Sequence, residues 1–527
     1  MPFFSGVPGE TSKKYFKSDG AFLLSGCILI LLTRLPQLWG SLFFPDGDEC
    51  AVGLMVKHFL EGKDFSLFLY GVPYGFSVFE TLPAALFFKL FGPSAAALKS
   101  AILCLWAAGW IFFVLALRRL GNRRVAVIGG LLLIFSPGWG ALSLKAWGTH
   151  VTAFTFTNLS LWILAGIYLS TEDCKKNALF LGCCLAVAGL ANPLWLLAMV
   201  PFIALLLCER KKISDLVFMI LGVIGLTTLI LFVQQAGMGI GTYWRPPVIA
   251  YWNILEAIRL LPGRVWVAMT GAYFLTNALA AGPATVFVTA VWIISSLFVF
   301  GYIAAGLVRR KHLDFLTRGF AGTILFILAI SLFCNKWLFG FRYFLPLIGS
   351  LAALAAVAID RLLSEGKIAG SSARIIFILL VFTGMMSLME FRHVPSSGWP
   401  TQPAVSETKA MADLTGRLLS QNIHYVYSVD SMFQWQVMFA SEEHIIARWR
   451  HPLDRYPEYP LAVDRAFASH EKTAVIGRIH EFEPLGKALV RREHFFSRAE
   501  DIDGLFMIIY DPSPELLNKM GFVLNQY

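Results

Sequence analysis

Charged residues are scarce in this sequence. Asp, Glu, Lys and Arg make up 15% of its 527 residues, against about 25% in an ordinary soluble protein. Hydrophobic residues make up 57% and recur in runs of about 20, the length that crosses a hydrocarbon layer of roughly 30 Å. The composition therefore excludes a soluble enzyme and predicts a polytopic α-helical membrane protein.

Cysteine is also scarce, with eight residues in the chain and none from 395 onward. Most of the eight lie within apolar runs, so neither a disulfide framework nor a paired Cys/His metal site is indicated. The first apolar run lacks a small-residue cleavage site after it. We therefore expect a retained span there rather than a removable signal peptide.

Basic residues give the chain a formal net charge of +10, but they gather in short links between apolar runs. The clusters are Lys13, Lys14 and Lys17; Arg118, Arg119, Arg123 and Arg124; Lys175 and Lys176; Arg210, Lys211 and Lys212; Arg309, Arg310 and Lys311; and Arg361, Lys367 and Arg374. This is the pattern of cytoplasmic loops under the positive-inside rule. It does not form a groove for nucleic acid, so no nucleic-acid partner is expected.

Placing every basic cluster inside gives about eleven spans, with the N-terminus inside and the C-terminus outside. We expect these spans near 20–39, 96–117, 125–142, 151–170, 178–191, 193–208, 214–234, 284–308, 319–334, 344–360 and 375–392. The pair between Lys176 and Arg210 is short, with Asn192-Pro193 at its apex. It predicts a shallow re-entrant hairpin or two short helices.

Two domains are expected. Residues 1–394 would form the membrane domain, whose first outer loop, 40–95, has amphipathic stretches at 49–61 and 76–91 suited to the membrane interface. Residues 395–527 would form a small soluble α/β domain after a Pro/Ser/Gly linker. Its β-like runs are 424–429, 444–449, 473–478 and 505–511, and its helical stretches lie near 405–420 and 484–490.

Three acids follow the first apolar run: Asp46, Asp48 and Glu49. The predicted topology puts them on the outer face of the membrane. In a purely structural role, Asp48 would be the N-cap of a helix ending at Gly62, and Glu49 would favour the helix dipole. A cap needs only one acid, so we expect at least one of the three to act in catalysis or metal binding, with Asp48 or Glu49 ahead of Asp46.

Glu80 is the only charged residue between Asp64 and Lys89, and it lies within an aromatic stretch. An interfacial helix from which the carboxylate reaches solvent would explain it structurally. Acids at this depth are costly enough, however, to make a functional role an equal alternative.

Some basic residues face outward against the positive-inside bias. Arg342 stands at the outer end of a predicted span, and arginine suits bidentate phosphate binding, although an interface anchor is the simpler role. Lys336, Lys145 and Arg245 are weaker candidates of the same kind. His150 is a further candidate for substrate or phosphate binding, although a polar residue at a helix end is the simpler role.

Taken together, these segments resemble the GT-C superfamily of polyprenyl-phosphate-sugar-dependent glycosyltransferases, and within it the bacterial protein O-mannosyltransferase-like and lipid A aminoarabinose transferase-like group. The motifs are Asp-Gly-Asp-Glu at 46–49, Tyr70-Gly71, Tyr74-Gly75 with Glu80, Leu90-Phe91-Gly92, Arg342-Tyr343-Phe344-Leu345-Pro346-Leu347, and Arg455-Tyr456-Pro457-Glu458-Tyr459. His150 and its neighbours match no motif of the family.

The resemblance implies an activity and a set of roles. Asp48, with Glu49 beside it, would be the catalytic carboxylate, and Glu80 a second acid that positions substrate or metal. Arg342 would face the lipid phosphate, with Tyr343 and Tyr74 in the substrate-binding set. A divalent metal held by Asp48 and Glu80 is left open.

The implied reaction moves a sugar from a polyprenyl-phosphate-linked donor to a hydroxyl of a lipid, glycan or protein, at the periplasmic face of a bacterial inner membrane. A carboxylate takes the acceptor proton and cations neutralise the departing phosphate, which favours a single inverting displacement. A lipid or glycan flippase or transporter stays open, although discontinuous helices in two matching halves would then be expected. A non-catalytic assembly or receptor subunit would leave the acids unexplained.

Overall fold

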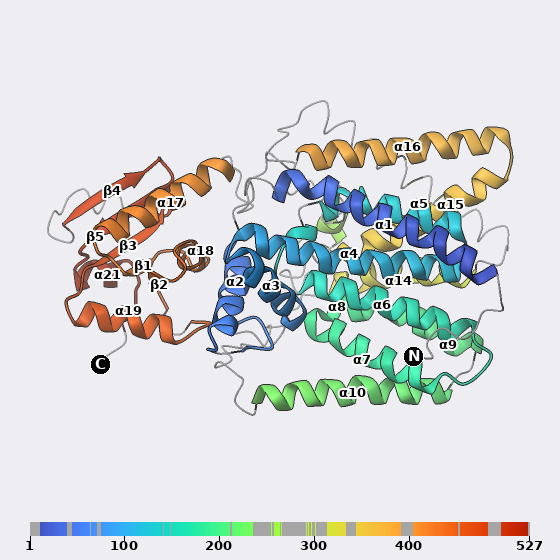
Figure 1. Ribbon diagram of the computed structural model, residues 1–527, viewed down its shortest axis with the longest axis horizontal. Helices are drawn as coiled ribbons and strands as arrows, with labels where there is room; N and C mark the ends of the chain where they lie inside the picture. The colour runs from blue at the N-terminus through green and yellow to red at the C-terminus, as the bar shows by residue number, and fades with distance from the viewer. Residues whose placement is uncertain are drawn as a thin grey trace.

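The computed structural model combines a bundle of long helices with a small sheet and its helices at one end (Figure 1). It describes residues 11–38, 45–63, 65–70, 75–140, 142–147, 149–210, 213–235, 314–333, 344–390, 404–451, 454–482 and 497–524, with a few further residues between 255 and 301. Five of the predicted site residues lie outside this part of the chain: Tyr74, Arg245, Lys336, Arg342 and Tyr343.

The bundle follows the apolar runs of the sequence. Its helices are α1 (Thr11–Leu38), α2 (Gly47–Leu60), α3 (Val78–Phe91), α4 (Ala95–Leu120), α5 (Arg123–Ile134), α6 (His150–Leu169), α7 (Lys175–Ala191), α8 (Pro193–Ala198), α9 (Val200–Arg210), α10 (Ile213–Gln235), α14 (Phe315–Phe333), α15 (Leu345–Ser364) and α16 (Lys367–Glu390). Two 3-10 turns, η1 (Pro137–Trp139) and η2 (Leu142–Leu144), stand between α5 and α6.

Within the described residues, seven helices are long and apolar enough to cross a membrane. The number is eight if Arg123–Ile134 and Pro137–Leu144, bent by 55°, form one broken span. By length and composition the chain is thus a multi-pass helical membrane protein. The total of eleven spans stays a prediction, because most of the expected span 284–308 lies outside the described residues.

The short central pair differs in part from expectation. Asn192 ends α7 and caps α8, where its side chain accepts a hydrogen bond from the N–H of Leu194 at 3.1 Å and Pro193 takes the first helical position. The following stretch, Pro193–Arg210, has the length and hydropathy of a span. The helix therefore ends at Asn192-Pro193 as predicted. The stretch that follows is longer than the predicted shallow re-entrant hairpin requires.

The outermost helices expose apolar side chains, as lipid-facing helices do. In Figure 1, α10 and α16 lie on opposite edges of the bundle, and exposed residues run along each, from Val217 to Phe232 and from Ile375 to Met385. Helix α3 also exposes a stripe that includes Leu82, Leu86 and Leu90, and its expected place at the membrane interface stays a prediction. Helix α2 does not, because ten of its residues are buried.

Residues 404–524 form a separate α/β arrangement, the C-terminal unit. Its elements are α17 (Ala404–Ser420), β1 (Tyr425–Ser428), α18 (Phe433–Ala440), β2 (Ile446–Arg448), α19 (Glu458–Ala468), β3 (Thr473–Arg478), β4 (Arg498–Ile502), β5 (Phe506–Tyr510) and α21 (Pro514–Lys519). The strand order is β2-β1-β3-β5-β4, with β1 parallel to β2 and β3 and the last two strands antiparallel.

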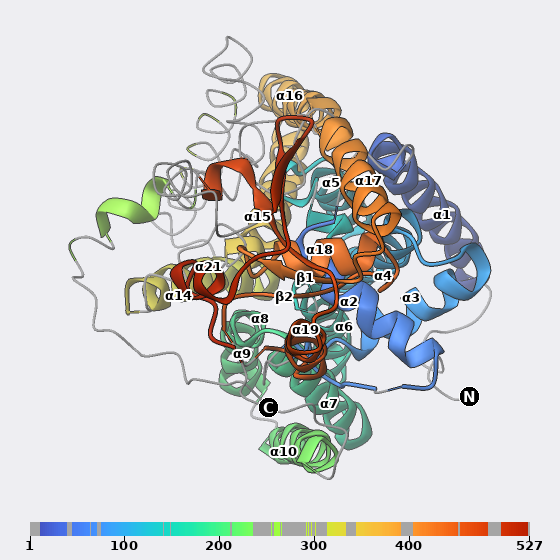
Figure 2. The same cartoon turned by 90° about the vertical axis from the view of Figure 1, so that its left-hand side faces the viewer.

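All four predicted strands are confirmed, whereas the sequence did not predict α18, α19, β4 and α21. The helix expected near 484–490 falls outside the described residues, as does the predicted domain boundary at 394/395. Figure 2 looks onto the C-terminal unit, with the membrane helices behind it.

The C-terminal unit packs directly on α2 through α18 (Figure 1). The fit needs glycine at two positions, since a Cβ on Gly47 would lie 2.7 Å from the carbonyl oxygen of Met432 and one on Gly53 would lie 2.4 Å from the Phe439 ring. One hydrophobic cluster continues from the membrane helices through α2 into the unit, where it includes Trp435. This covering by α18 is why α2 is buried instead of lying free at the interface.

Candidate functional site

Helix α2 begins with a reciprocal capping box. Its N-cap is Asp46, whose carboxylate accepts a hydrogen bond from the Glu49 N–H at 3.0 Å, while the Asp46 N–H donates to Glu49 Oε2 at 3.1 Å. The expectation that Asp48 is the N-cap is therefore wrong. The pattern D-x-x-E selects the acid three residues before a glutamate, which is Asp46. The helix ends as predicted, with Gly62 at φ +70°.

Two buried lysines hold the same acids. Lys99, on α4, donates to Glu49 Oε1 at 2.5 Å, and Lys145 donates to Glu49 Oε2 and to Asp46 Oδ2, each at 2.9 Å. Trp147 Nε1 also donates to Asp46 Oδ2, at 2.8 Å. Glu49 is fully buried and both lysine side chains are 2% exposed. Two carboxylates and two ammonium groups thus form one compact, charge-balanced network.

The charge of Asp46 is favoured by this network. Burial alone would raise the pKa of Asp46, but the Lys145 charge and hydrogen bonds from the Glu49 N–H, Lys145 and Trp147 hold that pKa below its usual value. Burial alone would lower the pKa of Lys145, yet the charges of Asp46 and Glu49 raise it above its usual value. Both groups are therefore ionised at neutral pH.

Asp48 lies apart from the lysine network. Its Oδ1 accepts a hydrogen bond from Arg455 Nη1, of the C-terminal unit, at 2.7 Å. Both side chains are 24% exposed, so the Asp48 carboxylate is more accessible than the enclosed Glu49 and about as accessible as Asp46, whose side chain is 23% exposed. Arg455 was identified in the sequence only as part of a motif, and the contact spans 407 positions of the chain.

Glu80 lies in the first turn of α3 and is fully buried. Its Oε1 accepts a hydrogen bond from the Thr152 hydroxyl at 3.1 Å. Two residues before Thr152, His150 begins α6, and its Nδ1 lies 3.4 Å from the Asn192 side-chain nitrogen. Glu80 and His150 thus both lie at helix starts, and the first turn of α6 contains both His150 and the Thr152 that donates to Glu80.

Four helix starts converge at this place. The segment that enters α6 reaches α2 through Lys145 and Trp147, α3 through Thr152, and α8 through His150. The turn before α3 is also tied to the end of α7, since the N–H of Gly75 donates to the Leu190 carbonyl at 3.2 Å. The starts of α2 and α8 are already capped by Asp46 and Asn192, whereas those of α3 and α6 have no side-chain cap. Because a helix carries partial positive charge at its N-terminus, the latter two favour an anion nearby.

Arg34 of α1 contacts the segment between α5 and α6 that leads to Lys145. It is not among the candidates identified from the sequence. It is fully buried, and its Nη1 donates to the Ile134 carbonyl at 2.8 Å while its Nε donates to Ser143 Oγ at 3.3 Å. These bonds fix the bend between α5 and the segment that carries Lys145. A lone arginine inside an apolar run was the signal that could have found it.

No group of three or more His, Cys, Asp or Glu side chains that could hold a metal ion occurs in the described part of the chain. Two of the nearby carboxylates, Asp46 and Glu49, are already neutralised by lysines. A metal between Asp48 and Glu80 therefore stays a prediction.

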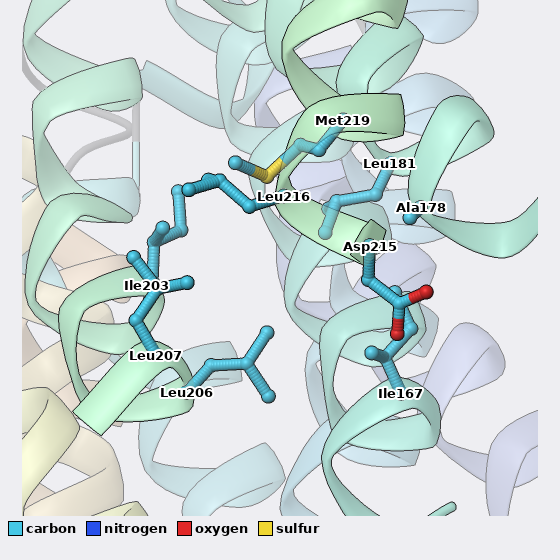
Figure 3. Close-up of a pocket in the computed structure, with 9 residues that line it drawn as sticks. All are labelled: Ile167, Ala178, Leu181, Ile203, Leu206, Leu207, Asp215, Leu216 and Met219. Carbon is cyan, nitrogen blue, oxygen red and sulfur yellow. The ribbon is translucent and has the colours of Figure 1, made fainter. Parts of the chain in front are cut away.

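A separate apolar pocket lies far from these acids. Figure 3 shows the carboxylate of Asp215 beside aliphatic side chains of α6, α7, α9 and α10, among them Ile167. The backbone N–H of Cys174 donates to that carboxylate at 3.0 Å. Ile167 and His150 are at opposite ends of α6, about 25 Å apart at 1.5 Å per residue, so this pocket is not part of the acidic site.

Comparison with known proteins shows which solved structures share this fold. No protein-family model matches the sequence, and no curated protein is significantly similar to it. Among solved structures, ArnT from Cupriavidus metallidurans bound to undecaprenyl phosphate matches with a TM-score of 0.57 and 13% identity, over 94% of this chain and 98% of that one. The apo state of the same protein matches with a TM-score of 0.58 and 13% identity, over 92% of this chain and 97% of that one.

The archaeal oligosaccharyltransferase AglB from Archaeoglobus fulgidus, in complex with an inhibitory peptide and a dolichol-phosphate, matches with a TM-score of 0.53 and 13% identity, over 97% of this chain and 77% of that one. At this identity the likeness concerns the fold, and it extends over nearly the whole chain. The resemblance inferred from the motifs is confirmed at the level of the fold, which this chain shares with ArnT and with the oligosaccharyltransferase AglB.

Proposed function

We propose that this protein is a membrane glycosyltransferase that moves a sugar from a polyprenyl-phosphate-linked donor to a hydroxyl group of a lipid, glycan or protein. The reaction would occur at the non-cytoplasmic face, which in a bacterium is the periplasmic face of the inner membrane. Its fold supports this class of reaction. The ArnT and AglB structures with polyprenyl or dolichol phosphate bound favour a donor of the same kind here.

The observation that carries the proposal is the division of labour among the three acids. Asp46 and Glu49 are bound by buried lysines and by the capping box of α2, which favours a structural role for both. Asp48 has no lysine partner among the described residues, which sets it apart from both, and it is more exposed than Glu49. It is therefore the acid best suited to receive a proton from an acceptor hydroxyl as the new bond to the sugar forms.

The departing group is a lipid phosphate, which leaves readily when positive charge neutralises it. The converging helix starts supply part of that charge, and Arg342, Lys336 and Arg245 are the side chains we propose for the rest. Lys145 is better assigned to the carboxylates that it contacts. With no covalent intermediate required, we propose one inverting displacement, in which Glu80 orients the substrate.

The test is donor turnover by the purified protein in lipid, with Asp48→Asn as the decisive variant. We expect the wild type to release polyprenyl phosphate in the presence of an acceptor. The variant should lose transfer by about 10²- to 10⁴-fold, the range of a positioned general base, while it inserts and folds normally. Asp46→Asn is the matched control, because it removes a neighbouring charge of the structural network.

Transfer retained by Asp48→Asn would move the base to another residue. Movement of the lipid across the bilayer without donor turnover would favour the flippase alternative. Labelling of single cysteines at position 48 and in the C-terminal unit tests the sidedness, and opposite sides would exclude the proposed site.

A further inference from the structure

The backbone around Arg455 is held in place on both sides. Before it, Asp454 accepts a hydrogen bond from the Arg455 N–H and another from Gln434 Nε2 of α18, each at 2.6 Å. After it, the buried Tyr456 ring packs against His58 and Tyr70, with ring centres 5.1 and 5.2 Å apart. These contacts fix the backbone at Arg455 and so hold its guanidinium beside the start of α2.

At that place Arg455 contacts the acid that we propose as the base. Its Nη1 lies 2.7 Å from Asp48 Oδ1. In the described part of the chain, the second carboxylate oxygen, Oδ2, receives no hydrogen bond. The contact thus fixes one oxygen of Asp48 and leaves the other for a proton.

The C-terminal unit does not need this pair to stay on α2. Gln436 Nε2 donates to the Pro45 carbonyl at 2.9 Å, beside the close packing at Gly47. At the other end of α2, Glu443 accepts one hydrogen bond from Lys57 Nζ at 2.6 Å and another from His58 Nε2 at 2.8 Å. A partly exposed ion pair adds little to such an interface, so docking alone does not account for Arg455.

We propose that Arg455 is a positioning residue for Asp48, through which the C-terminal unit completes the catalytic site. This inference rests on the proposed function. A short acidic side chain at a helix start has several rotamers, each of which directs Oδ2 to a different place. The fixed guanidinium selects one orientation, and small errors in the placement of a reacting group cost up to about 10²-fold in rate.

The experiment compares steady-state kinetics of the full-length protein in lipid for the wild type, Arg455→Gln and Arg455→Lys. We expect Arg455→Gln to lower kcat by about 10- to 100-fold and to change KM for the lipid-linked donor by less than about threefold. Arg455→Lys should recover part of the rate, because it keeps a donor but loses the rigid fork.

Two controls separate positioning from docking. Arg465→Gln removes an exposed arginine on α19 of the same unit, and its kcat should match the wild type. Glu443→Gln weakens the other end of the interface without touching Asp48, so it should lower the thermal unfolding midpoint and leave kcat within about threefold. Arg455→Gln should show the opposite pattern, with an unchanged midpoint.

An Arg455→Gln protein with wild-type kcat overturns this inference and leaves the proposed function intact. So does a rise in donor KM at unchanged kcat, which would make Arg455 a phosphate ligand, or a fall in unfolding midpoint equal to that of Glu443→Gln. A wild type that turns over no lipid-linked sugar overturns the proposed function and this inference with it.

Discussion

The ammonium group of Lys99 lies 2.5 Å from the carboxylate of Glu49, and both side chains are buried where α4 passes the start of α2. Neither charge has access to water, so each stabilises the other in a region of low dielectric. This pair joins a membrane helix to the loop that carries the candidate base.

Replacing Lys99 by methionine should destabilise the protein by about 3 kcal/mol, because a buried carboxylate loses one of its two cations. The measurement is the thermal unfolding midpoint in detergent. Lys89→Met, which removes an exposed lysine of α3, should leave the midpoint unchanged. An equal effect of the two substitutions would mean that the Lys99–Glu49 pair adds nothing to stability.

Glu80 should be required for transfer. Glu80→Gln keeps the shape of the side chain but removes its charge, and we expect transfer to fall by about 10²-fold. Thr152→Val removes the hydroxyl that donates to Glu80 and should cost about tenfold, as for a hydrogen bond to a charged group. Thr152→Ser is the matched control that keeps the hydroxyl. Wild-type transfer in Glu80→Gln would assign this acid to structure alone.

The contact of Glu443 with α2 predicts a pH dependence of stability. Burial alone would raise the pKa of Glu443, but hydrogen bonds from His58, Lys57 and Tyr459 lower it to about 2. An unfolded glutamate has a pKa of about 4.3. The stabilisation is therefore complete above about pH 4.3 and is lost as the pH falls toward 2.

Glu443→Gln should accordingly flatten the fall of the unfolding midpoint between about pH 4.3 and 2. Glu442→Gln changes the adjacent, exposed residue and should keep the wild-type profile. If the two variants show the same acid profile, the contact with Lys57 and His58 does not contribute to the pH dependence.

Met432 lies so close to Gly47 that a side chain at position 47 should destabilise the junction between α2 and the C-terminal unit. Gly47→Ala places a Cβ 2.7 Å from a backbone oxygen that cannot rotate away, and we expect a loss of about 1–3 kcal/mol and faster proteolysis of the C-terminal unit. Gly416→Ala, on α17 with open space around it, is the control and should be neutral or stabilising. Unchanged protease resistance in Gly47→Ala would show that the junction can relax.

Local patterns in the sequence predicted much of the fold. Helix α2 is predicted up to Gly62, Asn192-Pro193 marks the observed break before α8, and short β-like runs predict four strands of the C-terminal unit. These features depend on caps, proline and periodicity, which act within a few residues. The exception is the N-cap, because the capping-box spacing to Glu49 places it at Asp46 and not at Asp48.

The partners of the acids could not be predicted in the same way. Lys99, Thr152 and Arg455 come to Asp48, Glu49 and Glu80 from positions 50 to 407 residues away in the chain, and no local rule specifies such pairs. Lys99 still left a signal, since a single cation in an apolar run indicates a buried partner. The rest depends on tertiary packing, in particular on α18, which the strand and helix patterns did not reveal.

The bond between Gln436 and Pro45 joins residues 391 positions apart, which has a consequence for biosynthesis. Ribosomes complete α2 long before α18 exists, so the newly inserted loop presents bare glycines and apolar side chains until the last quarter of the polypeptide emerges. The contact of Asp48 with Arg455 is consequently made last. Nascent chains that stall before residue 433 would lack the contacts that α18 and Arg455 make with Pro45 and Asp48.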